Sequence, residues 1–382
     1  MSLELTLVGA RVLTPNGWSE APLSIVGGLL VSDTGGRAVD LSGYLVLPGI
    51  VDPHGDGFER HMAPRRGALR EAEHGVVAAA SELAANGITT AVLAQFFSWE
   101  GGMRGPEFAV HVFESVTAVR GSVPVDLRLQ LRLETHLLDD FARAELAVER
   151  FGIGYVVFND HLPHQRLAEG RKPPRLTGQA LKSGRSPEAH LALMRDLHAR
   201  SSEVPQALDH LTSRLLARGI VIGSHDDSTV ADRNEWARRG ASVSEFPETL
   251  EAAQAARDDG AHIVLGAPNV VRGASHAGNI SAADLIAEGL CDALASDYHY
   301  PSPLRAAFRL EELGLCDLVT AWAFLSSGPA RLLTLEDRGT LESGKRADLI
   351  VVDPKTRRVE ATIAAGRIAH LTGGVAERFL CG

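Results

Sequence analysis

The chain has 382 residues, 45% of them hydrophobic, and a formal net charge of −10. A chain of this size can bury a large core, and its length suggests one large domain with an accessory one. The acidic balance argues against a nucleic-acid-binding surface, which would need a basic face, but it leaves open a small phosphorylated substrate held by a few local cations.

Both ends of the chain consist of short β-runs separated by glycine turns. They cover residues 1–44 and 339–382, and together they predict one small β-sandwich domain. Residues 45–338 instead alternate apolar β-runs with amphipathic helical stretches, a pattern typical of a parallel sheet covered by helices. Eight runs favour a (β/α)8 barrel over an open doubly wound sheet. The runs cover residues 44–52, 88–95, 125–134, 154–160, 219–226, 241–247, 261–268 and 291–297.

The connection between the fourth and fifth runs, residues 162–218, is long for a barrel loop. It contains the segment "RLAEGRKPPRLTGQ", followed by two predicted helical segments. A connection of this kind can act as a lid over a site, and the sequence leaves open whether it does.

Carboxylates and imidazoles stand where the predicted strands end. Active sites of such barrels lie at the C-terminal strand ends, and six polar groups on one rim are hard to explain by stability alone. These six residues predict a metal site: His54, Asp56, Glu134, His161, His225 and Asp297.

The pattern is that of a two-ion centre. His54 and Asp56 lie two apart, so an extended segment points both the same way, although such a pair alone is more often just hydrogen-bonded. Two divalent ions roughly 3.5–4 Å apart need a shared anion, and no lysine that could be carbamylated lies on a predicted barrel strand. Glu134 is therefore the expected bridge. One ion is assigned to His54, Asp56 and Asp297, and the other to His161 and His225.

Asp297 is also the expected catalytic residue. As a ligand beside the attacking water, it could take the proton of that water and later pass one to the leaving group. Two alternatives stay open for the neighbouring acids. Glu134 could be a surface or helix-capping carboxylate, and Asp226 and Asp227 could either orient imidazoles or serve as charges at a helix N-terminus.

Longer motifs carry a family resemblance. "LPGIVDPHGD", "ASD" at the last run and "GTLESGKRADLIVVD" resemble the amidohydrolase superfamily. "NDHLPHQR", "GSHDDST", "GAPNVVRGASHAGNISAADLI" and "ASDYHYPSPLRAAFRL" are similar to one branch of it, the α-D-ribose 1-methylphosphonate 5-triphosphate diphosphatases of the carbon–phosphorus lyase pathway. The resemblance implies two divalent ions, expected to be zinc, on the same six ligands. It also implies hydrolysis of a ribose 5-triphosphate to the 5-phosphate and diphosphate in phosphonate catabolism.

Several residues depart from the pattern of that branch. Gly55 and Gly57 replace larger residues, "PHQR" replaces a Pro-Gly-Gln-Arg turn, and His299 and Tyr300 replace smaller apolar ones. These positions lie beside the predicted ligands, so they leave the metal site intact and the exact substrate open.

A triphosphate requires cations and hydrogen-bond donors, and arginine suits bidentate phosphate contact. Arg65 and its neighbour Arg66 could equally form a solvated pair at the rim. The expected substrate-binding residues are Arg60, His61, Arg65, Gln165, Arg166, Arg272, Ser275, His276 and Asn279.

Two other functions compete with this prediction. An amidohydrolase or deaminase acting on a cyclic amide would need the same metals but not the arginines. A non-catalytic barrel used as a scaffold would need neither, and six polar groups on one rim argue against it.

The sequence predicts a cytoplasmic protein. The first residues lack the basic and apolar regions of an export signal, and no apolar run is long enough to span a membrane. The three cysteines have no metal-type spacing and cannot all pair, which disfavours both disulfides and a thiolate zinc site. A homo-oligomer is compatible with the sequence.

Overall fold

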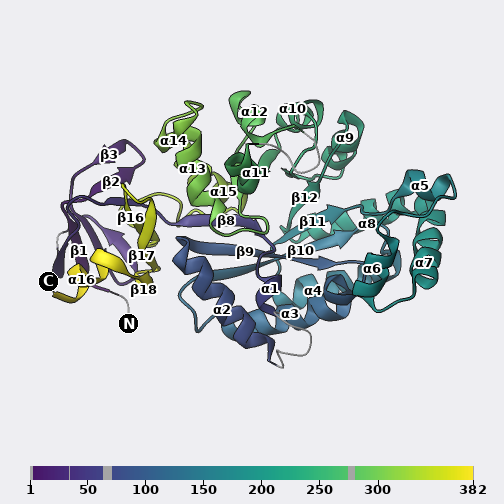
Figure 1. Ribbon diagram of the computed structural model, residues 1–382, viewed down its shortest axis with the longest axis horizontal. Helices are drawn as coiled ribbons and strands as arrows, with labels where there is room; N and C mark the ends of the chain where they lie inside the picture. Colours follow the sequence, from purple (N-terminus) through teal and green to yellow (C-terminus); the bar gives the residue numbers. More distant parts are fainter. Residues whose placement is uncertain (1–2, 34, 63–70, 274–279, 382) are drawn as a thin grey trace. The chain divides into compact units, whose positions relative to one another are not determined.

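The computed structural model describes residues 3–33, 35–62, 71–273 and 280–381 (Figure 1). By their contacts these residues form two compact units. Unit 1 comprises Met1–Leu93, Ala118–Arg128 and His262–Gly382, and unit 2 comprises Ala94–Thr117 and Leu129–Ala261. The domain limits expected from the sequence, 1–44 with 339–382 against 45–338, stay a prediction.

Eight parallel strands follow one another in chain order in a single sheet, which confirms the predicted (β/α)8 barrel class. Each strand overlaps the run that predicts it. The strands are β8 (Ile50–Gly55), β9 (Ile88–Phe97), β10 (Asp126–Glu134), β11 (Tyr155–Asn159), β12 (Val221–His225), β13 (Val243–Glu245), β14 (His262–Gly266) and β15 (Ala293–Ala295).

Within unit 1 the first and last barrel strands meet. Gly55 at the end of β8 forms a parallel bridge with Asp297, two residues beyond β15, and the backbone N–H of Asp297 donates to the carbonyl of His54 at 3.0 Å. The C-terminal ends of the two strands, where the sequence places metal ligands, therefore lie side by side.

The first predicted run, 44–52, is two strands rather than one. Its first part is β7 (Leu45–Pro48), which pairs with β16 (Leu349–Asp353) and with β2 (Arg11–Thr14), outside the barrel. The chain changes sheets at Gly49, where a side chain would clash with Thr89, since an added Cβ would lie only 2.3 Å from its Oγ1.

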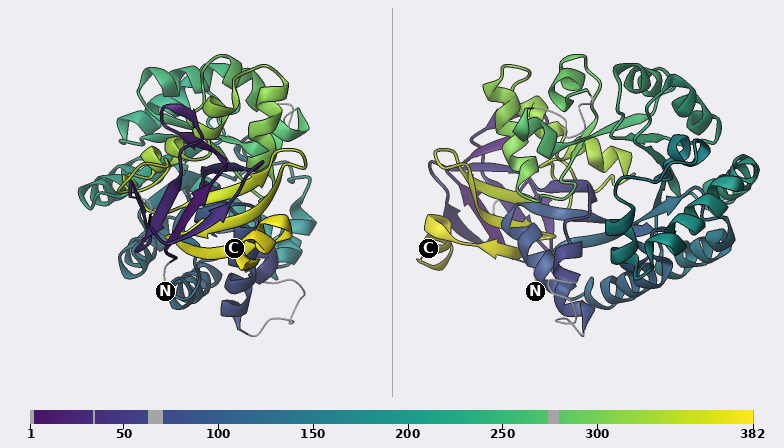
Figure 2. Two further views of the ribbon diagram at one scale, coloured as in Figure 1. Left: turned by 90° about the vertical axis from the view of Figure 1, so that its left-hand side faces the viewer. Right: turned by 45° about the vertical axis from the view of Figure 1, so that its right-hand side comes forward.

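The two chain ends build two sheets, as predicted for the small domain; both lie in unit 1, and Figure 2 shows the N-terminal (purple) and C-terminal (yellow) strands side by side. Their inward faces share one apolar core. The four-stranded sheet has the order β5 (Leu29–Val31), β4 (Leu23–Val26), β1 (Leu5–Val8) and β6 (Arg37–Asp40). The six-stranded sheet has the order β18 (Arg367–Leu371), β17 (Arg358–Ala364), β16, β7, β2 and β3 (Gly17–Ser19).

Helices connect the barrel strands. Those of unit 1 are α1 (Glu59–Met62), α2 (Ala72–Ala85), α11 (Ala267–Arg272), α12 (Ala282–Ala287), α13 (Ser302–Glu312), α14 (Leu318–Ala323) and α15 (Ser327–Leu332), with α16 (Gly373–Cys381) at the chain end. Those of the other segments are α3 (Pro106–Val119), α4 (Phe141–Phe151), α5 (His164–Ala168), α6 (Leu176–Ser183), α7 (Pro187–Ala199), α8 (Val204–Ala217), α9 (Val230–Arg238) and α10 (Leu250–Asp258). No helix in the described part of the chain is long and apolar enough to cross a bilayer.

Candidate active site

Three of the six predicted ligands converge in unit 1. One donor atom each from His54, Asp56 and Asp297 lies within 4.8 Å of the others. His54 is fully buried at the end of β8, whereas the two aspartates are partly exposed. The backbone fixes them together, because the N–H of Asp56 donates to the carbonyl of Asp297 at 2.9 Å. One imidazole and two carboxylates in this spacing fit a divalent ion such as zinc.

The backbone at Asp297 is in the left-handed region, with φ of 54°. Aspartate tolerates this conformation better than most residues, but it still has an energetic cost. Asp226 and Phe246, which directly follow β12 and β13, share it with φ of 59° and 53°. Strained residues of this kind cluster at functional sites, and here all three follow C-terminal strand ends.

A buried carboxylate below this ligand set holds the two strands in register. Asp52 on β8 is fully buried and accepts hydrogen bonds from the backbone N–H of Ser296, at 2.9 Å, and from its hydroxyl. Burial raises the pKa of Asp52, although the hydrogen bonds from Ser296 oppose the shift. Asp52 thereby supports the positions of His54 and Asp297.

Unit 2 brings together Glu134 and His161. The carboxylate of Glu134 is fully buried at the end of β10, and its Oε2 accepts from Trp99 Nε1 and from the backbone N–H of His161, both at 3.1 Å. Its Oε1 pairs with Nδ1 of His161. Burial lowers the pKa of His161, but the hydrogen bond and charge of Glu134 outweigh burial and the net shift is upward.

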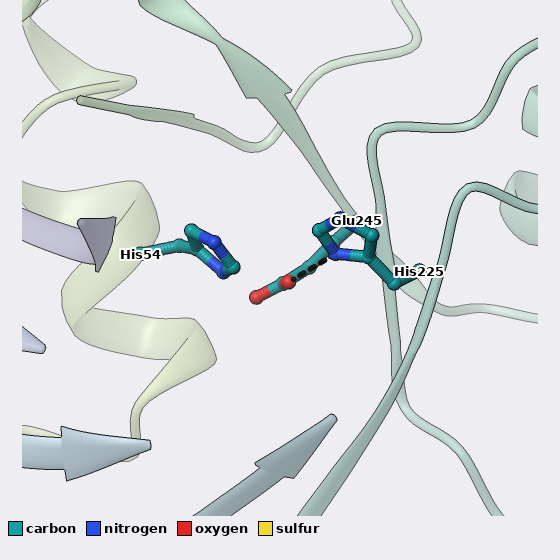
Figure 3. Close-up of side chains that lie close together, drawn as sticks. All are labelled: His54, His225 and Glu245. Carbon is teal, nitrogen blue, oxygen red and sulfur yellow. Dashed lines mark hydrogen bonds and ion pairs between the residues drawn. The ribbon is translucent and has the colours of Figure 1, made fainter. Parts of the chain in front are cut away.

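The third ligand of unit 2, His225, is held in one tautomer. Its Nδ1 lies 3.0 Å from Oε2 of Glu245 (Figure 3), and its Nε2 lies 3.0 Å from Nη2 of Arg132. A guanidinium can only donate, so Nε2 accepts and the hydrogen is on Nδ1, which donates to Glu245. Burial lowers the pKa of His225. A neutral imidazole with an unprotonated Nε2 is the form that binds metal ions.

Glu245 is a site residue that the sequence analysis missed. It ends β13, is fully buried, and also accepts from Gln130 Nε2 at 2.8 Å and from the hydroxyl of Tyr155 at 2.7 Å. A carboxylate behind a metal-binding imidazole fixes its tautomer and raises its basicity. The available signal was the position of Glu245 within the sixth apolar run, "ASVSEFP".

Replacing Glu245 by Gln should weaken zinc binding at His225 about 10–100-fold, the usual effect of removing a partner that orients a ligand. The amide keeps the shape but loses the charge that holds the Nδ1 hydrogen. Competition between protein and a zinc chelator measures the affinity, with Glu251→Gln on the exposed face of α10 as the matched control. An affinity equal to wild type would show that Glu245 does not support a ligand.

Two comparisons with known sequences identify the family. Residues 188–371 match the family described as amidohydrolase. The α-D-ribose 1-methylphosphonate 5-triphosphate diphosphatase of Escherichia coli (strain K12) is 34% identical over 335 residues, which are 85% of this chain and 87% of that protein. The chain belongs to the amidohydrolase family. It is accordingly a hydrolase, with His, Asp and Glu groups that could hold metal.

Solved structures agree with the amidohydrolase fold. A Xaa-Pro dipeptidase with bound methionine has a TM-score of 0.64 and 16% identity over 96% of this chain and 99% of its own. An N-acetyl-D-glucosamine-6-phosphate deacetylase from Mycobacterium smegmatis has a TM-score of 0.62 and 16% identity over 95% of this chain and 99% of its own. At these identities the likeness concerns the fold alone.

Two of the predicted phosphate-binding residues contact a carboxylate of the protein itself. Arg60 and His61, both in α1, contact the carboxylate of Glu82 on α2. Arg60 also donates to the carbonyl of Tyr298 at 3.2 Å and stacks over the ring of Tyr300 at 5.3 Å. Its charge is therefore partly neutralised, and a substrate phosphate would have to share Arg60 with Glu82.

The remaining predicted substrate residues are distributed as follows. Gln165 and Arg166 lie in α5, where Gln165 donates to Glu169 at 3.2 Å. Arg272 ends α11, and its guanidinium donates to the hydroxyl of Tyr298. Their role in binding stays a prediction. The other four predicted substrate residues, and Arg66 beside the first of them, lie outside the described part of the chain: Arg65, Ser275, His276 and Asn279.

Three residues that depart from the pattern of the resembled branch pack together: Gly55, Gly57 and Tyr300. Tyr300 is fully buried. A Cβ on Gly55 would lie 3.2 Å from its ring and 2.7 Å from a carboxylate oxygen of Asp52, and a Cβ on Gly57 would lie 3.3 Å from its Cζ. The glycines thus leave the space that the tyrosine ring fills.

Unit 2 also contains a pocket of about 550 Å³, and its wall includes the predicted ligands His161 and His225. The wall has one arginine, Arg239, and five acidic residues: Asp160, Asp226, Asp227, Asp232 and Glu235. Such a wall attracts cations, so an anionic substrate could bind there only with positive groups between it and the carboxylates.

Proposed function

We propose that this amidohydrolase cleaves α-D-ribose 1-methylphosphonate 5-triphosphate, or a closely related ribose 5-triphosphate, to the 5-phosphate and diphosphate in phosphonate catabolism. The observation that carries the proposal is the 34% identity over 85% of the chain to a diphosphatase of that name. The positions of the polar side chains support it, because every ligand expected from that resemblance stands at or just beyond the C-terminal end of a barrel strand.

The proposed cofactor is a pair of divalent ions, with zinc favoured by the imidazole and carboxylate donors. When bound, they would lower the pKa of the attacking water and neutralise charge on the phosphate. The proposed ligands are His54, Asp56 and Asp297 for one ion, His161 and His225 for the other, and Glu134 for both.

Asp297 is the proposed proton carrier. Its carboxylate would take the proton of the water that attacks phosphorus and return it to the departing diphosphate oxygen. The backbone bonds to His54 and Asp56 hold the residue in place, while its partial exposure leaves the carboxylate within reach of substrate. Burial lowers the pKa of His225 and so favours the neutral ring, and Glu245 would hold the hydrogen on Nδ1.

Guanidinium groups would bind the polyphosphate. Arg60, Arg166 and Arg272 are the described arginines among the predicted substrate residues. Each could make bidentate contacts to phosphate oxygens, which a neutral cyclic amide would not use.

The substrate class can be tested by incubating the zinc-loaded enzyme with a ribose 5-triphosphate and, separately, with a dihydropyrimidine. Diphosphate release from the first, abolished by a chelator and restored by zinc, is expected. Ring opening of the dihydropyrimidine without diphosphate release would favour the cyclic-amide alternative. A protein that takes up no zinc and acts on neither substrate would favour a non-catalytic scaffold.

Arg272→Ala should raise KM for the triphosphate roughly 10- to 150-fold, because a hydrogen bond to a charged group contributes about 1.5–3 kcal/mol. Thermal stability should hardly change, since the side chain is exposed and, among the described residues, donates to one tyrosine hydroxyl. Steady-state kinetics and a melting curve measure both effects, with Arg195→Ala on the exposed face of α7 as the control. Easy unfolding of the Arg272 variant would instead assign the residue a structural role.

A further inference from the structure

Another group of side chains that could hold a metal ion lies in unit 2, outside the proposed catalytic ligands. His136 follows β10, Asp160 follows β11, and His164 begins α5. One donor atom from each lies within 4.8 Å of the other two. We call these three residues the His136 cluster. Nothing in the proposed hydrolysis uses them.

The separations within the His136 cluster match those around a single ion. Nε2 of His164 lies 3.0 Å from Oδ2 of Asp160, and Nδ1 of His136 lies 3.5 Å from the same oxygen. With zinc–ligand bonds of about 2.0–2.2 Å in a tetrahedron, neighbouring ligand atoms are roughly 3.3 Å apart. An ion could therefore fit with small movements of the side chains alone.

The hydrogen bonds of His136 indicate that its Nδ1, the ring nitrogen beside Asp160, carries no hydrogen. The hydroxyl of Ser201 donates its one hydrogen to the carbonyl of His198 at 2.7 Å, so it accepts at 3.1 Å from Nε2 of His136. Nδ1 is then the unprotonated nitrogen. The hydroxyl of Thr135, 3.0 Å away, donates to it when no ion is bound.

His164 is supported in the same way. Its Nε2 donates to the carboxylate of Asp160 at 3.0 Å, and its Nδ1 lies 2.8 Å from Nδ1 of His198. If an ion replaced the hydrogen on Nε2, the ring would take its other tautomer and Nδ1 would donate to His198. Metal-binding histidines almost always have the second ring nitrogen held by such a partner. Both imidazoles of the His136 cluster have one.

We propose that His136, Asp160 and His164 form an additional site for a divalent cation of the zinc class, separate from the two-ion centre. Asp160 and His164 line the acidic pocket, and their side chains are 40% and 35% exposed, so an ion can reach them. Three protein ligands leave a coordination position for water or for an anionic oxygen of a ligand in the pocket. The acidic wall would attract the cation.

A proton on His164 is the alternative to a metal ion in the His136 cluster. If His164 is protonated, it forms an ordinary ion pair with Asp160. Nδ1 of His136 then accepts from Thr135 and still lies 3.5 Å from Oδ2 of Asp160. A cation would bind both of these acceptor atoms, and a proton on His164 does not. Zinc counting distinguishes the two occupants.

The test compares zinc content after saturation with zinc and gel filtration. His164→Gln and Asp160→Asn should each contain one zinc ion fewer per chain than wild type, by elemental analysis and native mass spectrometry. His210→Gln, an exposed histidine of α8, should match wild type. Melting curves establish whether each variant is folded. If one of the two variants misfolds, the other still tests the site.

Equal zinc content in the wild type and both cluster variants would overturn the additional site and leave the ion pair. Because the result is a difference of one ion, it does not depend on how many ions the catalytic ligands hold or on which substrate is cleaved. As a cross-check, Glu134→Gln should leave the ion of the His136 cluster in place, and a further His164→Gln substitution should remove it.

Discussion

Asp297→Asn is expected to lower kcat by roughly 10²–10⁴-fold with little change in KM, the usual span for losing a general acid–base group. The amide has nearly the same shape and can still coordinate through oxygen, but it cannot accept the proton of the attacking water. The backbone should be unaffected, because asparagine tolerates the left-handed conformation of this position as well as aspartate does.

Part of that loss could come from weaker metal binding, so the wild type and the variant are compared at measured, saturating zinc. Asp139→Asn, at an exposed aspartate after β10, controls for the change in charge. If the Asp297 variant keeps its ions and nearly full kcat, proton transfer must be assigned to another group, with His276 or His299 next.

The barrel strands were predictable because burial on both faces of a parallel sheet produces continuous apolar runs. The run at 125–134 predicts β10 almost residue for residue, and it places Glu134 at the strand end. The same property explains the error at 44–52. Apolarity marks a buried strand but not the sheet to which it belongs, so β7 and β8 looked like one strand.

The long connection was predicted with two helical segments, whereas the structure has four α-helices and one short 3-10 helix between β11 and β12. Helix α5 has five residues and α6 has eight, too few for a helical period to stand out in a segment rich in proline and arginine.

The site was predictable where a ligand sits at the end of a recognisable run, as with His225. Glu245 lies within a predicted apolar run, but the run alone does not single it out as a site residue, because it ends a strand of only three residues. Its burial depends on Gln130 and Tyr155, which are 115 and 90 residues away. Arg132 was missed for the same reason, since its contact with His225 spans 93 residues.

Glu134→Gln should remove one zinc ion and most of the hydrolytic activity while the fold persists. The buried hydrogen bonds can survive the change. The amide oxygen can accept from Trp99 and from the His161 backbone, as Oε2 does. The amide N–H can donate to His161 Nδ1 if that ring takes its other tautomer. The unfolding free energy should therefore change by about 1 kcal/mol or less, the scale of one ordinary hydrogen bond.

The lost negative charge accounts for the expected loss of metal. Two divalent ions roughly 3.5–4 Å apart repel strongly, and a shared carboxylate offsets that repulsion. Elemental analysis of the Glu134 variant and of Glu251→Gln, the exposed control on α10, should differ by one zinc ion per chain. A folded Glu134 variant that retains all its zinc and its activity would exclude Glu134 as the bridge, leaving Glu245, the other fully buried glutamate at a strand end of unit 2, as the carboxylate to test. If the variant instead melts far below wild type, Glu134 stabilises the barrel through Trp99 and His161, and its assignment as a bridging ligand loses its basis.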